Sequence, residues 1–487
     1  MNRIGYWLMV CTFVWLTACK EEVVPSKTVE EKPVLFPDYV EVTIPSTIAP
    51  LNFRVEAEYE KIDVKVQGVQ GEVLHVQERS VAKFPVEDWA ALLAQNRGGE
   101  LKLTVSLKQE GKWIQYAPFS VYVSEAPIDY GLVYRLIAPG YEVYSKMGIY
   151  QRDLSNFTQT AIYENTLIPS SCVNCHSFCH NDPTKMSLHL RGDHGGTIFL
   201  NNGTVDFLNT KTQQTISSCV YPYWHPSGRF VAYSVNHTQQ VFHAVRDERI
   251  EVIDLASDVV VYDVEQNALF SCPQLKSETA FETFPAFSPD GKSLYFCSAV
   301  RQEMPMDYQK VKYNLCRIAF DPETKTFSQQ VDTLVAAASE GKSVSFPRPT
   351  PDGKYLVYTL SNYGNFSIWH READLYMLDL QSGKSRRLDE INSPDVESYH
   401  SFSSNGRWMV FSSRRLDGLY TRPYIVFVGE DGRMGKPFLL PQEDPEQNEM
   451  SLYSYNIPEF VTAPVSLDIH AVEQKAMKRD YKNVGYE

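Results

Sequence analysis

The sequence predicts an all-β protein in which an N-terminal β-sandwich precedes a six-bladed β-propeller. Residues 36–126 contain short runs in which apolar and polar side chains alternate, such as "YVEVTIP", "LKLTVSL" and "FSVYVSE". This period of two is typical of strands with one buried face. Between residues 127 and 462 one hairpin motif recurs at a spacing close to that of a propeller blade. The chain is therefore expected to form two β domains in succession.

Residues 1–18 predict a signal peptide, because Arg3 precedes an apolar run, Tyr6–Leu16, that is too short to span a bilayer. The letters "LTAC", which end at Cys19, resemble the bacterial lipobox, in which the cysteine is acylated. Lys20–Glu22 also resembles the surface-export signal of Bacteroidetes lipoproteins. These resemblances imply a lipid-anchored protein of the cell envelope, at the outer membrane and on its periplasmic or surface side. An ordinary secretory signal is the alternative.

Residues 19–35 are charged and lack apolar periodicity, which predicts a flexible tether between lipid and first domain. The β-sandwich, immunoglobulin-like in type, is expected over residues 36–126. One helix interrupts its strands in "PVEDWAALLAQNRGG", where Pro85 starts the helix and Gly98–Gly99 ends it. We expect its apolar face to cover the sandwich through the following residues: Val86, Trp89, Ala90 and Leu93.

Four segments of the second domain align without gaps: "YPYWHPSGRFVAYS", "TFPAFSPDGKSLYFCS", "SFPRPTPDGKYLVYTLS" and "SYHSFSSNGRWMVFSS". Each predicts two strands joined by a tight turn with glycine at the left-handed position. The turn glycines are Gly228, Gly291, Gly353 and Gly406, separated by 63, 62 and 53 residues. This motif resembles the repeat of TolB-like six-bladed propellers, and the resemblance implies their fold for residues 127–462.

Two further blades are expected at residues 147–165 and 187–210, which keep the outer strands but lack the turn motif. A propeller has to close its ring, and residues 455–461 are predicted to pair with the blade at 130–165. The remaining tail, residues 463–487, is expected to be partly helical.

A loop at residues 168–196 is predicted to carry the chemistry. Its "CVNCH" matches the c-type haem attachment pattern, with Cys172 and Cys175 bonded to the porphyrin and His176 on the iron. Met186 is favoured as the opposite axial ligand. The other candidates for that position are His180, His189 and His194. Covalent haem c in an exported protein would imply electron transfer or another redox role, with a redox partner that the sequence does not specify.

Two alternatives to haem stay open. The segment offers a zinc site built from Cys172, Cys175, His176, Cys179 and His180, although zinc sites usually draw on two separated pairs. It also offers a disulfide, Cys172–Cys175 or Cys175–Cys179, which an oxidising compartment permits. In that case the protein is a haem-free propeller scaffold that binds a protein or a glycan. The other cysteines are expected to be small buried hydrophobes: Cys219, Cys272, Cys297 and Cys316.

Other polar groups carry weaker signals. A polar pocket near the cysteine segment, or a plain hairpin turn, is indicated by Arg191, Asp193 and His194. We expect a structural role for His225 in its blade turn. Ordinary surface charge is the favoured interpretation, over an anion site, for Arg414, Arg415 and Arg422.

Charge and missing motifs exclude several classes of function. The formal net charge of −14, without basic blocks, argues against a nucleic-acid partner. The sequence contains no nucleophile elbow, P-loop, zinc-protease motif or dinucleotide fingerprint. Hydrolase, kinase and dehydrogenase activities therefore lack support, and a redox activity stays open.

Overall fold

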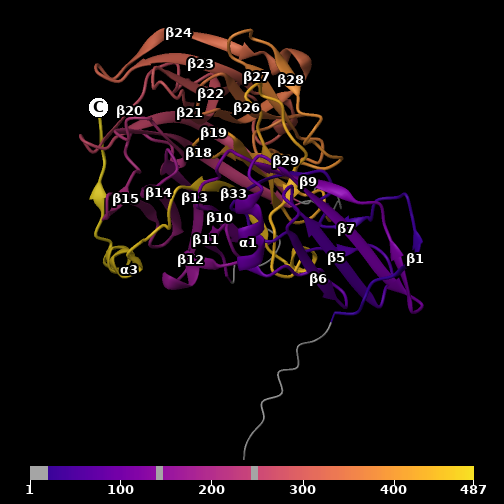
Figure 1. Ribbon diagram of the computed structural model, residues 1–487. Coiled ribbons are helices and arrows are strands. Elements are labelled where there is room, and N and C mark those ends of the chain that lie inside the picture. Colours follow the sequence, from indigo (N-terminus) through magenta and orange to yellow (C-terminus); the bar gives the residue numbers. More distant parts are fainter. Residues whose placement is uncertain (1–19, 139–145, 243–249) are drawn as a thin grey trace, which may run out of the picture.

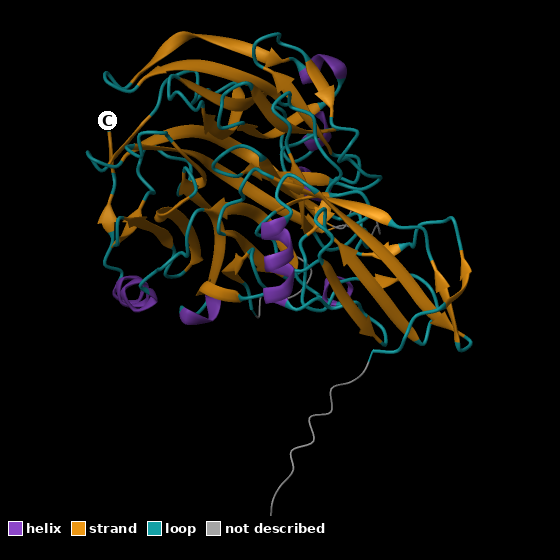
Figure 2. Ribbon diagram, viewed as in Figure 1, coloured by secondary structure: helices purple, strands orange, loops and turns teal. Residues whose placement is uncertain are grey.

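The computed structural model describes residues 20–138, 146–242 and 250–487, and almost all of its regular structure is β (Figures 1 and 2). The N-terminal sheet lies on the right of Figure 1 and the propeller on the left. None of the helices in these ranges is long and apolar enough to cross a membrane. Cys19, the predicted lipidation site, lies outside the described residues.

The N-terminal domain contains one seven-stranded sheet and a separate two-stranded sheet, β2–β4. The strands are β1 (Pro25–Thr28), β2 (Leu35–Phe36), β3 (Thr43–Pro45), β4 (Arg54–Val55), β5 (Lys61–Gln67), β6 (Val73–Glu78), β7 (Glu100–Gln109), β8 (Lys112–Gln115) and β9 (Phe119–Ser124). The central strand β7 pairs with β5 on one edge and with β8 and β9 on the other. An immunoglobulin-like sandwich stays a prediction for this domain.

The predicted helix is present as α1 (Val86–Gln95), but its buried face differs from the expected one. Trp89, Leu92 and Leu93 are buried, whereas Val86 and Ala90 are exposed. The indole Nε1–H of Trp89 donates to the carbonyl of Ile48 at 3.2 Å. The helix is thus rotated toward Leu92, because the large Trp89 ring fixes which side meets the domain core.

The predicted tether is ordered in part, which corrects that expectation. Strand β1 pairs in parallel with β8, and the Glu21 carboxylate lies 2.6 Å from Lys108 Nζ and 2.9 Å from Lys61 Nζ. A charged segment can still pair as an edge strand, because ladder hydrogen bonds use only its backbone. The segment from Lys20 to Thr28 therefore lies against the first domain.

Six four-stranded blades form the propeller, as predicted. In order from the channel outward, their strands are β33 (Ser454–Val461), β10 (Gly131–Ile137), β11 (Gly148–Asp153) and β12 (Gln159–Glu164) in blade 1; β13 (Ser171–Cys179), β14 (Asp182–Gly192), β15 (Gly196–Asn201) and β16 (Thr204–Asn209) in blade 2; β17 (Val220–Trp224), β18 (Phe230–Phe242), β19 (Ile250–Asp263) and β20 (Ala268–Phe270) in blade 3; β21 (Ala280–Phe287), β22 (Ser293–Val300), β23 (Asn314–Asp321) and β24 (Thr326–Val335) in blade 4; β25 (Ser343–Pro349), β26 (Tyr355–Ser361), β27 (Asp374–Asp379) and β28 (Ser385–Arg387) in blade 5; and β29 (Glu397–Phe402), β30 (Trp408–Ser413), β31 (Arg422–Phe427) and β32 (Phe438–Leu439) in blade 6.

The first strands of the blades contact one another in a closed ring, β33–β13–β17–β21–β25–β29, which lines the central channel. Strand β33 closes this ring by pairing antiparallel with β10, so the predicted pairing of residues 455–461 is observed. The tail then forms α3 (Ile469–Lys478), β34 (Lys482–Asn483) and β35 (Gly485–Tyr486). The last two strands add to the outer edges of blades 2 and 3, beside β16 and β20.

The two domains share one hydrophobic core. Side chains of the N-terminal domain such as Tyr39 and Phe53 belong to the same buried cluster as Leu132 of blade 1 and Trp408 of blade 6. Hydrogen bonds also cross the junction, since Tyr39 Oη donates to the carbonyl of Leu439 at 3.3 Å. The N-terminal domain is therefore packed firmly against the closing blades.

Candidate functional site

The cysteine segment is the innermost strand of blade 2, not a loop between two blades. Residues Ser171–Cys179 form β13, and the chain reverses at His180 and Asn181, whose φ angles are 49° and 61°. Residues 168–196 thus supply two blade strands, β13 and β14, and the predicted blade segment at 187–210 begins too late.

The reason for the error is that this hairpin is a further copy of the blade repeat. "NCHSFCHND" aligns with "SYHSFSSNG" of blade 6, so Cys175 corresponds to Tyr399 and His176 to His400. The two turn residues, His180 and Asn181, are neither glycine nor proline, so the sequence pattern did not mark this hairpin as a blade repeat. The position of His176 and His400 is a His or Pro in all six inner strands. In five of the six, the next residue lines one cavity at the end of the channel: Ser177, Tyr223, Arg348, Ser401 and Glu459.

His176 and His400 both lie buried in their inner strands, and burial lowers the pKa of each imidazole to about 3. His400 Nε2 lies 2.9 Å from the carbonyl of Val357, in the second strand of blade 5. The four other inner strands carry proline at this position: Pro222, Pro285, Pro347 and Pro458. The position of His176 is therefore one that this fold fills with a structural residue.

The predicted haem ligands do not converge on an open space. Cys175 is buried and its thiol, whose pKa burial raises, lies beside the backbone of Tyr221, whereas His176 Nε2 lies on the blade 1 side, 3.8 Å from Glu459 Oε2. Met186 is buried in the core of blade 2, opposite Phe178 rather than opposite His176. A porphyrin needs both thiols and the imidazole on one accessible face, and this arrangement does not fit one.

The two alternatives to haem at the cysteine segment, a zinc site and a disulfide, are not supported by the described residues either. All seven cysteines in the described ranges are free thiols. The same ranges contain no group of three or more His, Cys, Asp or Glu side chains placed to hold a metal ion. Cys219 and Cys297 are buried among apolar side chains, as the sequence analysis expected of strand cysteines.

The remaining histidines make local structural contacts. Nδ1 of His189 lies 3.2 Å from Thr197 Oγ1, and Nδ1 of His194 lies 3.1 Å from the carbonyl of Ala476 in α3. His225 Nε2 lies 3.0 Å from the carbonyl of Gly291, in the turn of the next blade. His225 thus joins two blades, which is the structural role expected of it, and His180 lies in the β13–β14 turn.

The arginines assigned to surface charge are mostly buried, which corrects that prediction. Arg422 is fully buried, and its guanidinium donates to three backbone carbonyls, of Asn448, Ser451 and Tyr453, each at 2.7 Å. Arg414 is also buried, and its guanidinium lies over the ring of Trp369. The loop is therefore part of the packed interior.

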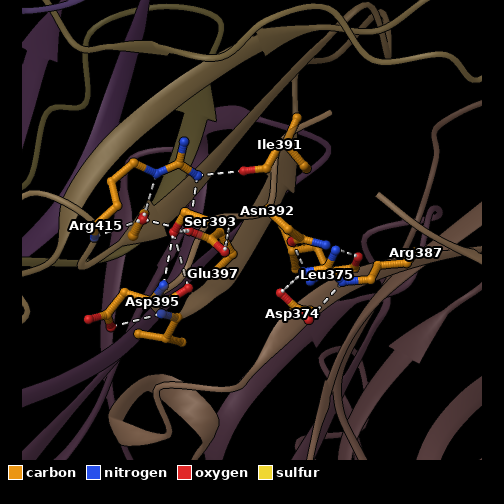
Figure 3. A network of polar contacts seen from close by, with 11 residues as sticks. Asp374, Leu375, Arg387, Ile391, Asn392, Ser393, Asp395, Glu397 and Arg415 are labelled. Atoms are coloured by element: carbon orange, nitrogen blue, oxygen red, sulfur yellow. Dashed lines mark hydrogen bonds and ion pairs between the residues drawn. The ribbon is translucent and has the colours of Figure 1, made fainter. Parts of the chain in front are cut away.

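Arg415 belongs to a polar network at the junction of blades 5 and 6 (Figure 3). Its Nη2 lies 2.9 Å from the carboxylate of Glu397, which also accepts hydrogen bonds from Ser393 and Ser413. Burial raises the pKa of Glu397, and the bonded Arg415 opposes that rise. The network fixes the connection from β28 to β29, and its acidic partner already occupies the guanidinium of Arg415.

The cavities of interest lie at the two ends of the central channel. One has a volume of about 180 Å³ and is called here the arm-side mouth. Its lining comprises Arg135, Ile137, Ala138, Cys172, Asn174, Arg191, Tyr221, Thr238, Gln240, Val252, Phe366, Ile368, Trp369, Tyr399, Ser454 and Asn456. Amides, guanidinium groups and aromatic rings from five blades therefore meet at one end of the channel.

The long hairpin of blade 3 extends over this mouth. Strands β18 and β19 pair well beyond the length of the other blade strands, up to Phe242 and Ile250. Two carboxylates on this extension contact the loop between β26 and β27 of blade 5: Asp254 accepts from Asn365 Nδ2 at 2.7 Å, and Glu251 lies 3.2 Å from His370 Nε2. The extension, called here the arm, is thereby joined to blade 5 across the channel.

The other end of the channel, called here the turn-side mouth, holds a cavity of about 290 Å³. Arg348 lies between the rings of Tyr223 and Phe346, with its guanidinium carbon 5.0 Å and 4.7 Å from their centroids. Burial raises the pKa of Glu459 to about 7, although Arg348 opposes the rise. Sequence reasoning missed these two residues, because only alignment of all six inner strands marks the position after each His or Pro as channel-facing.

Comparisons with known proteins add no functional assignment. No protein-family model matches the sequence, and no curated protein matches it. Similar solved structures include a DUF4784 family protein from Bacteroides caccae, at 9% identity and a TM-score of 0.30, covering 73% of this chain and 94% of that one. The tricorn protease (12% identity, TM-score 0.33) is matched over 80% of this chain and 43% of its own. Dipeptidyl peptidase 4 from Porphyromonas gingivalis (12% identity, TM-score 0.31) is matched over 66% and 52%. At these TM-scores the likenesses carry no argument about activity.

Proposed function

We propose that this chain is a binding protein of the cell envelope that holds its ligand at the arm-side mouth of the propeller channel. The observation that carries the proposal is the convergence of side chains from five blades on one cavity beneath the arm. Ligand sites in proteins are typically concave, with apolar walls and a few well-placed polar groups. The mouth has this character, since Trp369 and Tyr399 stand beside Asn174 and Asn456.

The composition of the mouth favours a polar ligand with a flat or ring-shaped part. Aromatic faces offer contact area at low entropic cost, and amide groups offer both donors and acceptors. The small volume fits the end of a glycan or a compact molecule better than a folded domain. Of the two ligands considered for a haem-free propeller, a protein or a glycan, these features therefore favour a glycan.

A glycan array tests this proposal. Fluorescently labelled protein is applied to an array of bacterial and host glycans, beside an Asn174→Ala/Trp369→Ala double variant and the control Arg433→Gln. Arg433 is strongly exposed and lies outside the mouth. We expect a set of glycans that binds the wild type and the control, and not the double variant. Absence of binding, or binding that survives the double substitution, would contradict the proposal.

Attachment to the envelope is a separate part of the proposal and rests on the lipobox resemblance at Cys19. Cells that express the full chain are fed an alkyne analogue of palmitate, and the protein is then coupled to a fluorophore. Labelling of the wild type and its loss in Cys19→Ser would support acylation. Equal labelling of both proteins, or none of either, would refute it.

The haem hypothesis keeps one supporting observation, the "CVNCH" pentapeptide itself. A pyridine haemochrome spectrum and an intact mass, on protein made with cytochrome c maturation machinery, decide the matter. We expect a colourless protein of unmodified mass, because Cys175 and His176 are buried in a blade strand. A c-type spectrum with the added mass of one haem would overturn this expectation.

A further inference from the structure

We propose that the ligand of the arm-side mouth carries an oxyanion group, a carboxylate, sulfate or phosphate, and that Arg135 and Arg191 bind this group. The inference rests on the proposed function and narrows its ligand class. It follows from the position of two guanidinium groups at one cavity and from the finding that neither forms an ion pair with a carboxylate of the described residues.

Arg135 is held in place but keeps hydrogen-bonding capacity. It lies in β10, and its Nη1 donates to Asn174 Oδ1 at 2.9 Å and to the carbonyl of Val173 at 3.3 Å. Its Nε is buried and has no hydrogen-bond partner among the described residues. Nη1 thus fixes the guanidinium, whereas Nη2 forms no hydrogen bond among the described residues and stays able to donate to an oxyanion in the mouth.

Arg191 approaches the same space from the neighbouring blade. It lies in β14 directly across from Cys172, and both residues line the mouth with Asn174. Its side chain is exposed, and within the described residues it forms no salt bridge. The two guanidinium groups therefore face one cavity from blades 1 and 2.

The acidic groups of the region do not neutralise these arginines. No carboxylate oxygen in the described residues lies within 4.0 Å of the guanidinium nitrogens of Arg135 or Arg191. Asp254, an acid of the arm, is buried and accepts hydrogen bonds from Asn236 and Asn365, each at 2.7 Å. Burial raises its pKa to about 7, which reduces its negative charge near neutral pH, although its two asparagine partners and the charge of Arg191 oppose the rise.

This local excess of positive charge stands out because the chain as a whole carries a formal charge of −14. Unpaired guanidinium groups in a concavity with low-dielectric walls concentrate the field there and attract anions. Two like charges at one mouth repel each other, and a bound oxyanion would offset that repulsion. The aromatic residues beside them, Trp369 and Tyr399, suit a sugar ring that bears the anionic group.

Isothermal titration calorimetry with small probes tests the inference. The probes are glucuronate, glucose 6-phosphate and glucose 6-sulfate, with glucose as the uncharged control, and their relative affinities identify the oxyanion. We expect at least one charged probe to bind and glucose not to bind over the same range. Arg135→Gln and Arg191→Gln should each weaken binding by about tenfold or more, as expected when a charge-assisted hydrogen bond is lost. Arg433→Gln should leave it unchanged.

Two further measurements keep the test decisive. Thermal melting establishes that each variant is folded, and Arg135→Lys, which keeps the charge but loses the planar fork, should recover only part of the affinity. Binding should also weaken as the salt concentration rises. If array binding depends on the mouth but neither arginine matters and no charged probe binds, the oxyanion inference fails and the proposed function survives. If array binding itself is absent, both fail.

Discussion

His176 and His400 occupy the same position of the blade repeat, but only His400 has a hydrogen-bond acceptor. Both nitrogens of the His176 ring are buried without a hydrogen bond among the described residues, and Nε2 lies 3.8 Å from Glu459 Oε2. His400→Leu would leave the carbonyl of Val357 unpaired, and we expect the free energy of unfolding to fall by about 1–3 kcal/mol. His176→Leu removes an unpaired polar ring, so we expect it to be neutral or slightly stabilising. Thermal and urea denaturation of the two variants measure the difference.

This pair of variants also bears on the haem hypothesis. If His176→Leu destabilised the protein as much as His400→Leu does, His176 would have either a strong interaction with Glu459 or a partner that the described residues do not supply. An equal loss would therefore contradict the structural role assigned to His176.

Glu282 is expected to make the protein less stable in alkaline solution. Its carboxyl is buried in β21, and burial raises its pKa from 4.5 to about 8, helped by the nearby Asp258 and opposed by Arg301. Between these two pKa values the folded state binds more protons than the unfolded state, so the stability contributed at low pH is lost as the pH rises through 8. The slope from one such group is at most about 1.4 kcal/mol per pH unit.

Glu282→Gln should flatten this pH dependence, because the amide is neutral at every pH. Melting temperatures between pH 6 and pH 9 provide the measurement, and Glu303→Gln, at an exposed position, provides the control. A wild-type slope that persists in Glu282→Gln would show that other groups carry it.

At the scale of the elements, the sequence predicted strands best where turn residues mark them. Hairpins with Gly228, Gly291, Gly353 and Gly406 were found because these glycines adopt φ angles between 68° and 71°, which other residues rarely adopt. The β13–β14 hairpin was missed because His180 and Asn181 take the left-handed conformation without glycine. Its cysteines then invited a chemical interpretation.

The candidate site was less predictable than the fold, because its residues come from separate blades. Arg135 and Arg191 are distant in the sequence, and the packing of blade 1 beside blade 2 brings them to one mouth. The sequence analysis named Arg191 because it lies close to the cysteine segment. No motif or turn near Arg135 pointed to a functional role. The arm was not predicted either, because no particular residue type marks the point where β18 and β19 extend beyond the length of a blade strand.

Ring closure by β33 is expected to be essential, whereas the tail after it is not. β33 pairs with β10 and contacts β13 and β29 on either side. A chain that ends at residue 453 would expose the edge of β10 and open the inner ring, so we expect it to aggregate. A chain that ends at residue 466 loses only α3, β34 and β35. We expect it to stay monomeric with a lower melting temperature.

Size-exclusion chromatography with light scattering, followed by thermal melting, distinguishes these two truncated chains. A folded monomer from the chain that ends at residue 453 would show that the other five blades close without β33.

At the scale of the whole molecule, the shared core makes the N-terminal domain part of the propeller's own stability. Tyr39 is buried at the junction and its hydroxyl donates to the carbonyl of Leu439 of blade 6, and Asn52 Nδ2 donates to the carbonyl of Glu443 at 2.9 Å. Two domains joined only by a linker would unfold independently. A common core instead predicts one cooperative transition for both.

Tyr39→Ala tests this coupling, because it removes a large side chain from the common core. We expect a cost of about 3–5 kcal/mol, by analogy with other buried aromatic side chains. Tyr39→Phe, which loses only one hydrogen bond, should cost about 1 kcal/mol. Hydrogen exchange followed by mass spectrometry should show faster exchange in β7 of the first domain and in β30 and β31 of blade 6 together. If β7 lost protection in Tyr39→Ala while β30 and β31 kept theirs, the two domains would be separate folding units that merely touch.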